Sequence, residues 1–186
     1  MVCPVLIVGC GDLGGAVAGR LHQEGFAVTG VRYSQAQAPA GIDLIRADVT
    51  QIDSLESLAD LRPQILLYCV AANAQSDESY KAHYVDGLRN VLSVLGPFNS
   101  LRHVFFVSST RVYGQQTDEL LDEDTPAQPA DFGGFRLYEA ESLLNDLNIP
   151  ATVFRLSGIY GPGRTRLIKL AATPSLWPAH NSWTNR

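Results

Sequence analysis

The chain has 186 residues, of which 46% are hydrophobic and 18% charged, a composition typical of a soluble globular protein with a sizeable core. Its 14 basic and 19 acidic residues give a net charge of −5, which argues against nucleic acid as a partner. The apolar runs are too short to span a membrane, so no membrane partner is expected. The three cysteines, Cys3, Cys10 and Cys69, fit neither a disulfide framework nor a metal-ligand cluster. We therefore expect a cytoplasmic protein without a metal site.

Short apolar segments typical of buried strands alternate with segments that carry an apolar stripe at helical spacing. The predicted strands are residues 5–9, 27–31, 44–47, 64–70, 103–108 and 151–156. The predicted helices are residues 13–24, about 54–61, 80–95 and 135–147, and residues 115–131 form a polar loop. Strands without polar alternation, separated by helices, predict an α/β fold over residues 1–156: a Rossmann-type doubly wound parallel sheet with helices on both faces. Such sheets bind ligands at the carboxyl ends of their strands.

A glycine-rich turn follows the first predicted strand and opens the first predicted helix. Gly9, Gly11 and Gly14 fit the pattern G-x-G-x-x-G, with Asp12 and Leu13 between the last two glycines. The first glycine permits a tight turn, the second lets the backbone approach a pyrophosphate, and the third packs helix against strand. The amides at the start of the helix favour phosphate. The sequence therefore predicts a dinucleotide loop at these five residues, and a glycine-rich turn without a ligand is the alternative.

The end of the second predicted strand selects the form of the dinucleotide. A carboxylate there would bind the ribose 2′-hydroxyl of NAD, but this chain has Arg32 and Ser34 and no acid. A guanidinium pairs bidentately with phosphate, so these residues favour NADP, with its 2′-phosphate, over NAD. The alternative is that Arg32 is a solvated loop residue.

Two further strand ends are expected to complete the cofactor site. After the third strand, the Asp48 carboxylate is placed to accept from the adenine amino group, with Val49 against the ring. A turn or helix cap is the alternative role of Asp48. After the fourth strand, the small residues Ala71 and Ala72 let the chain pass close to a bound dinucleotide.

Three motifs resemble the extended short-chain dehydrogenase/reductase family, which includes NAD-dependent sugar epimerases and dehydratases. They are Val-Asp-Gly-Leu-Arg-Asn-Val-Leu at 85–92, Val-Ser-Ser-Thr-Arg-Val-Tyr-Gly at 107–114, and Arg-Leu-Ser-Gly-Ile-Tyr-Gly-Pro-Gly at 155–163. The resemblance covers nearly the whole chain. It implies a small-molecule substrate, of which nucleotide sugars are one class, and a homodimer formed through helices 80–95 and 135–147.

Two features depart from this resemblance. The family continues beyond the last motif, so residues 157–186 are expected to be the start of an incomplete C-terminal substrate-binding lobe. The family also uses a tyrosine acid/base with a lysine four residues later, and no tyrosine of this chain has a lysine at that spacing. One alignment places Phe132 and Arg136 at these positions, and another places Gly133 and Leu137 there.

Other hydroxyl groups remain as candidates for catalysis. Ser109 matches the serine that hydrogen-bonds the reacting oxygen in the family, and Tyr113 lies near the same strand end. A strand-end serine that caps backbone groups, and a tyrosine that packs against a loop, are the alternatives. The histidines at positions 22, 83, 103 and 180 show no ligand spacing.

Two functions follow as hypotheses. The first is an NADP-dependent oxidoreductase, epimerase or dehydratase that acts on a nucleotide sugar or another hydroxylated metabolite. The second is an inactive NADP-binding sensor or regulatory module, which the missing Tyr/Lys pair favours.

Overall fold

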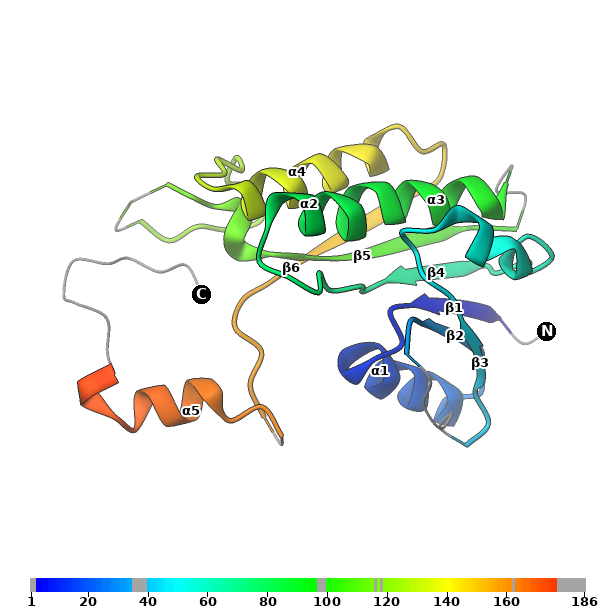
Figure 1. Cartoon of the computed structure of the whole chain (residues 1–186), viewed down its shortest axis with the longest axis horizontal. Coiled ribbons are helices and arrows are strands. Elements are labelled where there is room, and N and C mark those ends of the chain that lie inside the picture. The colour runs from blue at the N-terminus through cyan, green and yellow to red at the C-terminus, as the bar shows by residue number, and fades with distance from the viewer. Residues whose placement is uncertain are drawn as a thin grey trace.

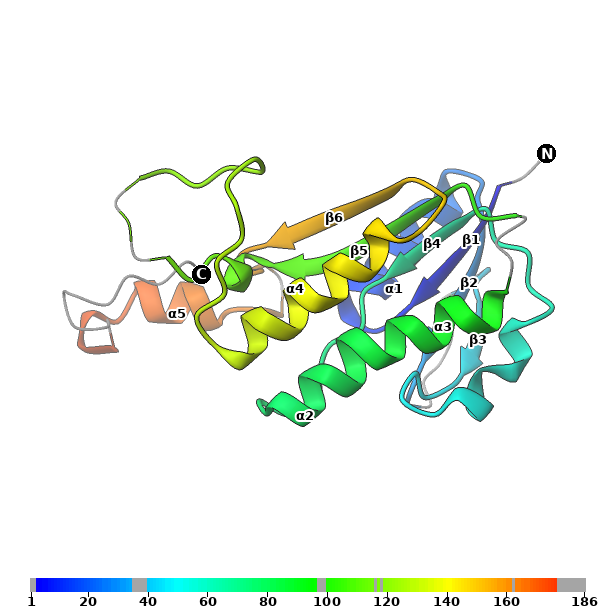
Figure 2. The same ribbon diagram turned by 90° about the horizontal axis from the view of Figure 1, so that it is seen from above.

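Six parallel strands form a single sheet with helices on both of its faces (Figures 1 and 2). The structure, a computed structural model, describes residues 3–34, 40–96, 100–115, 117, 119–161 and 163–176. The strands lie in the order β3-β2-β1-β4-β5-β6. Their bounds are β1 Pro4–Val8, β2 Ala27–Arg32, β3 Asp43–Arg46, β4 Ile65–Tyr68, β5 His103–Ser109 and β6 Ala151–Leu156. This order confirms the predicted Rossmann-type doubly wound sheet.

The helices between the strands cover the two faces. The α-helices are α1 Asp12–Gln23, α2 Asp77–Tyr80, α3 Gly87–Leu95, α4 Phe132–Asn145 and α5 Arg166–Ala171. Helix α1 packs on one face, and α3 and α4 pack on the other (Figure 2). Short helical segments complete the set: the 3₁₀-helices η1 Ile52–Leu58, η3 Thr110–Val112 and η4 Pro174–Leu176, and the π-helix η2 Lys81–Asp86.

Burial on both faces explains why the strands read as unbroken apolar runs. In β1, Leu6 and Val8 pack with residues of α3 and α4, whereas Val5 and Ile7 pack with residues of α1. All four side chains are buried. Each such aliphatic side chain contributes about 1.5–3 kcal/mol when it is removed from water, so the strand specifies its place between the two helical layers.

Local capping shifts several of the predicted boundaries. The segment predicted as a helix from Ser54 is a 3₁₀-helix that begins at Ile52. The Ser54 hydroxyl donates to the Asp48 and Gln51 carbonyls and does not cap a helix that starts at residue 54. The helix predicted from residue 135 begins at Phe132, because Asp131 accepts from the Gly134 amide at 2.9 Å and caps it. The helix predicted over 80–95 begins three residues earlier and is interrupted by η2.

Residues after β6 extend away from the sheet (Figure 1). Their described part carries α5 and η4, and residues 177–186 of the predicted C-terminal lobe lie outside the described residues. Strand β6 ends at Leu156, and a division of the chain into two domains at this residue stays a prediction.

The loops after β1 and β4 meet at the point where the strand order reverses. Gly9 has φ +95°, and a β-carbon at this position would lie 2.6 Å from the Cys69 carbonyl group. The Cys69 thiol donates to the Gly9 carbonyl at 3.3 Å, and burial raises the thiol pKa to about 12, which keeps it protonated as a donor. Only glycine combines this backbone conformation with this approach.

A buried polar network ties β5, α4 and β6 together next to this crossing. The Glu141 carboxylate is 6% exposed, accepts from the Ser108 hydroxyl at 2.5 Å and pairs with the Arg155 guanidinium at 2.7 Å. Arg155 also donates to the Tyr113 hydroxyl at 2.6 Å and stacks over its ring. Because each charge has its partners, the network can be buried without a large penalty.

Gly14 and Gly15 give a matched test of the packing of α1 on the sheet. A β-carbon on Gly14 would lie 2.4 Å from the Gly9 carbonyl oxygen, whereas one on Gly15 meets nothing within 4 Å. We expect Gly14→Ala to lower the free energy of unfolding by about 1–3 kcal/mol through overpacking. Gly15→Ala should raise it by about 0.5–1 kcal/mol through helix propensity. Urea denaturation measures both, and equal effects would contradict this packing.

Glu141 and Glu139 form a second matched pair on α4. Glu141→Ala leaves the Arg155 charge without its buried partner and should cost about 3–5 kcal/mol of unfolding free energy. Glu139 pairs with Arg136 at 2.8 Å but is 41% exposed, so Glu139→Ala should cost less than about 1 kcal/mol. Urea denaturation compares the two variants, with Glu141→Gln as a milder change. A Glu141→Ala cost as small as that of Glu139→Ala would rule out a structural role for the network.

Candidate functional site

A cavity of about 660 Å³ opens at the carboxyl ends of the strands. The loops after β1, β2, β3, β4 and β6 contribute to its wall, together with the last residues of β5. Most residues predicted to bind the cofactor line it, namely Gly9, Gly11, Asp12, Leu13, Arg32, Ser34, Asp48, Val49 and Ala71. Gly14 lies behind the wall, where it packs against Gly9, and Ala72 is not among the lining residues. Predicted residues from four separate segments, at the ends of β1, β2, β3 and β4, therefore meet at one cavity.

The glycine-rich turn presents backbone to this cavity. Gly11 precedes the first residue of α1, and a β-carbon there would meet no atom within 4 Å. The open space in front of Gly11 and the unsatisfied amides of the first helical turn form a cradle for an anion. The chain thus has room for a pyrophosphate where the pattern predicts one.

Arg32 and Ser34 act as a pair at the end of β2. The Arg32 Nη2 donates to the Ser34 hydroxyl at 2.9 Å. The Arg32 Nε is buried and has no hydrogen-bond partner among the described residues. On the next strand Arg46 lies in register with Arg32, and its Nε donates to the Tyr33 carbonyl at 3.3 Å. Two positive charges therefore stand side by side at this end of the sheet.

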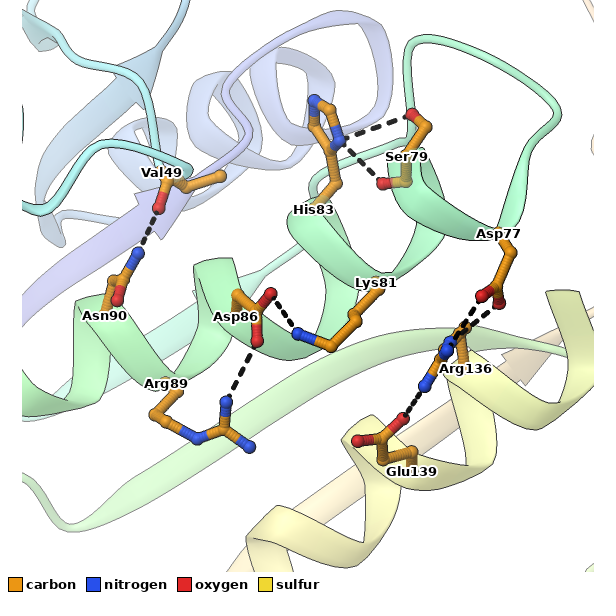
Figure 3. A network of polar contacts seen from close by, with 10 residues as sticks. All are labelled: Val49, Asp77, Ser79, Lys81, His83, Asp86, Arg89, Asn90, Arg136 and Glu139. Carbon is orange, nitrogen blue, oxygen red and sulfur yellow. Dashed lines mark hydrogen bonds and ion pairs between the residues drawn. The ribbon is translucent and has the colours of Figure 1, made fainter. Parts of the chain in front are cut away.

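Asp48 shapes the turn after β3 as well as lining the cavity. Its Oδ1 accepts from the Thr50 amide at 2.9 Å and from the Thr50 hydroxyl at 2.8 Å. The turn is anchored from α3 by Asn90, whose amide donates to the Val49 carbonyl at 2.9 Å (Figure 3). The predicted turn role of Asp48 is therefore present, and its position on the cavity wall is present with it.

An ion pair closes one side of the cavity. The Arg164 Nε lies 2.5 Å from the Asp12 Oδ2, and both residues line the wall. Arg164 follows β6, whereas Asp12 is the first residue of α1. This pair brings a second guanidinium to the part of the cavity beside the glycine-rich turn. The sequence motif alone did not indicate this position.

The two hydroxyls proposed for catalysis lie in different surroundings. Ser109 lines the cavity at the end of β5, where its hydroxyl accepts from the Arg111 amide at 3.2 Å. Tyr113 is 8% exposed and is absent from the lining. Its hydroxyl donates to the Asp122 carbonyl at 2.9 Å and accepts from Arg155. The structure therefore brings Ser109, and not Tyr113, to the cavity.

Of the four positions that the two alignments offer for the missing Tyr/Lys pair, Leu137 alone is among the residues that line the cavity. Arg136 points to Asp77 and Glu139 between α2 and α4 (Figure 3). The Arg111 guanidinium covers Gly133, where a β-carbon would lie 2.3 Å from its central carbon. Neither alignment therefore places a pair of proton-carrying side chains on the cavity wall.

Two residues that the sequence reasoning passed over, His83 and Tyr84, also line the cavity. Both belong to η2, where the backbone switches from α- to π-helical hydrogen bonding. Single π-turns are frequent at functional sites because they turn side chains out of the regular helical register. Burial raises the pKa of the Tyr84 phenol, so that the hydroxyl remains protonated. The only sequence signal for this arrangement was a histidine on the helix that follows β4.

Within the described residues, the structure holds no cluster of three or more metal-ligating side chains. No helix in the same residues is long and apolar enough to cross a membrane.

Several known proteins are similar to this chain in sequence or in structure. A curated relative, protein YeeZ of Escherichia coli K12, is 32% identical over 172 residues, which cover 86% of this chain and 60% of YeeZ. A structure from Methylobacillus flagellatus, described as of the NAD-dependent epimerase/dehydratase kind, is 52% identical with a TM-score of 0.85. The match covers 99% of this chain and 64% of that one. This chain thus spans less than two thirds of the length of either protein.

A more distant likeness shows the fold alone. Bordetella bronchiseptica WbmG, solved in complex with NAD and UDP, is 20% identical with a TM-score of 0.73. The match covers 87% of this chain and 55% of WbmG.

A family model, described as the NAD dependent epimerase/dehydratase family, matches residues 5–174. Because this match runs from β1 past α5, the chain belongs to the NAD-dependent epimerase/dehydratase family.

Proposed function

We propose that the chain binds NADP in preference to NAD. The observation that carries this proposal is Arg32, whose buried Nε lacks a partner while its Nη2 is oriented by Ser34. A 2′-phosphate would supply the missing acceptor and would neutralise the charge beside Arg46. The end of β2 carries no carboxylate that would bind an unphosphorylated ribose.

The reaction we propose is an oxidoreductase, epimerase or dehydratase reaction on a hydroxylated metabolite. The dinucleotide supplies the hydride chemistry when it is bound, and the protein orients the substrate and manages its proton. Ser109 is proposed to donate a hydrogen bond to the substrate oxygen, because its hydroxyl lies on the cavity wall at the end of β5. The UDP held by WbmG makes nucleotide sugars the first substrate class to test.

A binding module that senses NADP is the second candidate. Neither alignment of the chain, on Phe132 and Arg136 or on Gly133 and Leu137, supplies the family's Tyr/Lys pair, and this absence favours a protein without turnover. The two candidates separate on one assay, in which the chain and NADP⁺ are offered a panel of nucleotide sugars. Both the absorbance of NADPH and the conversion of each sugar are followed, because an epimerase or dehydratase returns the hydride and leaves no net NADPH. Reduction of NADP⁺ by any member of the panel, or conversion of any member to product, excludes the sensor.

The cofactor proposal is tested by titration of the chain with NADPH and with NADH, read by nicotinamide fluorescence. Arg32→Ala removes a charged hydrogen bond of about 1.5–3 kcal/mol, so NADPH should bind roughly 10- to 150-fold more weakly. Binding of NADH should change little, because it has no 2′-phosphate. The control is Arg62→Ala, since Arg62 is exposed next to β4 and donates to the Ala59 carbonyl. A wild-type preference for NADH would overturn the proposal.

We also propose that α3 and α4 carry a homodimer contact. Phe135 and Tyr138 on α4 are 56% and 44% exposed, which is unusual for aromatic side chains on a helix of a monomer. We expect the wild-type chain to sediment as a dimer and Phe135→Glu to sediment as a monomer, because a charge in an apolar contact is costly. Leu120→Glu, in an exposed loop, is the control and should leave the dimer intact. A monomeric wild-type chain would exclude this contact.

A further inference from the structure

His83 has an unusually defined orientation for a histidine on the wall of a cavity. Its ring Nδ1 lies 2.8 Å from the Ser79 carbonyl oxygen and 3.5 Å from the Ser79 hydroxyl. Figure 3 shows the other ring nitrogen pointing away from Ser79. The residue is only partly buried, and it lines the cavity that holds Ser109 and Leu137.

The contact with Ser79 fixes where the ring carries its proton. A carbonyl oxygen only accepts hydrogen bonds, so Nδ1 must be the protonated nitrogen of the neutral ring. The Nε2 of the same ring then has an unshared electron pair. This is the arrangement by which a backbone carbonyl orients a histidine base and selects its tautomer.

Hydrogen bonds hold both ends of this arrangement in place. The Tyr68 hydroxyl, which is fully buried, donates to the backbone carbonyl of His83. Ser79 is held in turn, since its amide donates to the Ser76 hydroxyl at 3.2 Å and its own hydroxyl donates to Asn73 Oδ1 at 2.8 Å. The imidazole is thus preorganised before any ligand binds, as general acid–base catalysis requires.

Other groups on the same wall are already engaged or are unsuited to accept the substrate proton. The Asp12 carboxylate is paired with Arg164, and Asp48 Oδ1 accepts from the amide and the hydroxyl of Thr50. The pKa of Tyr84 is raised by burial, and the Cys69 thiol, with its pKa of about 12, already donates to Gly9. Leu137 has no polar atom, and a serine hydroxyl such as that of Ser109 donates a hydrogen bond far more readily than it takes up a proton. The unshared electron pair on Nε2 of His83 makes the imidazole the suitable acceptor.

We propose that His83 is the catalytic residue that transfers the substrate proton in this cavity. The inference rests on the proposed function, and it concerns the proton alone. The O–H bond of a substrate carbinol breaks and an N–H bond forms at Nε2, so that the oxygen keeps the electron pair and the imidazole becomes imidazolium. The same proton returns to the oxygen in the reverse direction. His83 therefore does the work for which this chain has no Tyr/Lys pair.

The tautomer can be measured without any substrate. In the full chain labelled with ¹⁵N-histidine, two-bond ¹H–¹⁵N correlation spectra show which ring nitrogen of each neutral histidine is protonated. The His83 signals are assigned by their loss in His83→Gln. We expect the proton on Nδ1 and none on Nε2. A proton on Nε2 would overturn the proposal, because that ring could not both bond to Ser79 and act as a base.

The chemical role is tested by rescue. With a nucleotide sugar that the wild-type chain turns over, His83→Ala should lower kcat by at least about 100-fold while NADPH binding stays as in the wild type. Free imidazole should restore part of that turnover, which a purely structural role would not allow. His22→Ala, an exposed histidine on α1, is the matched control and should have no effect. Unchanged turnover in His83→Ala, or a loss that imidazole does not relieve, would overturn the proposal.

The tautomer spectrum and the rescue experiment together distinguish a failure of this inference from a failure of the proposed function. A wild-type chain that binds no NADPH, or that turns over no member of the panel, contradicts the proposed function. In that case the tautomer spectrum still decides whether His83 presents a bare Nε2 to the cavity, and a proton found there rejects the inference on its own.

Discussion

The backbone of Gly9 lies against the backbone of Cys69, and the position of every cavity residue depends on this contact. It joins the ends of β1 and β4, the two strands between which the order of the sheet reverses. Helices leave this point toward opposite faces, α1 toward one and the α2–α3 segment toward the other (Figure 1). A crevice must open between them, and the side chains at the neighbouring strand ends must line it. A larger residue at position 9 would separate the two loops and with them the two halves of the cavity.

Positive charge in this acidic chain is placed where an anion would sit. The net charge is −5, yet Arg32 and Arg164 both line the cavity, one at the ribose end of the predicted cofactor site and one beside the glycine-rich turn. Arg164 is held by Asp12 at 2.5 Å, so a negatively charged ligand would compete with an internal carboxylate for it. Arg32 has no such competitor at its Nε. A bound anion would have to displace a carboxylate from Arg164 but would displace no partner from the Arg32 Nε. For this reason the cofactor proposal rests on Arg32.

The sheet and the glycine-rich turn could be predicted from sequence because both depend on local signals. Apolar runs that alternate with helical stripes specify the layers, and the spacing of Gly9, Gly11 and Gly14 specifies the turn. The rest depends on contacts between distant segments. Tyr113 reads as a candidate for catalysis until Arg155 and Asp122 are seen to occupy its hydroxyl.

A π-helical segment is a feature that a sequence pattern does not reveal, and the proposed proton transfer depends on one. The π-helical hydrogen bonding of η2 changes the register of the helix after β4, and His83 and Tyr84 in this segment both line the cavity. The site then combines a hydroxyl that stays protonated, at Tyr84, with an imidazole whose Nδ1 is engaged by a carbonyl. Arg111 fills the space over Gly133, and its guanidinium is held there by Asp131 and Tyr80. The proton transfer proposed for His83 would therefore come from η2, which packs against α4, and not from α4 itself.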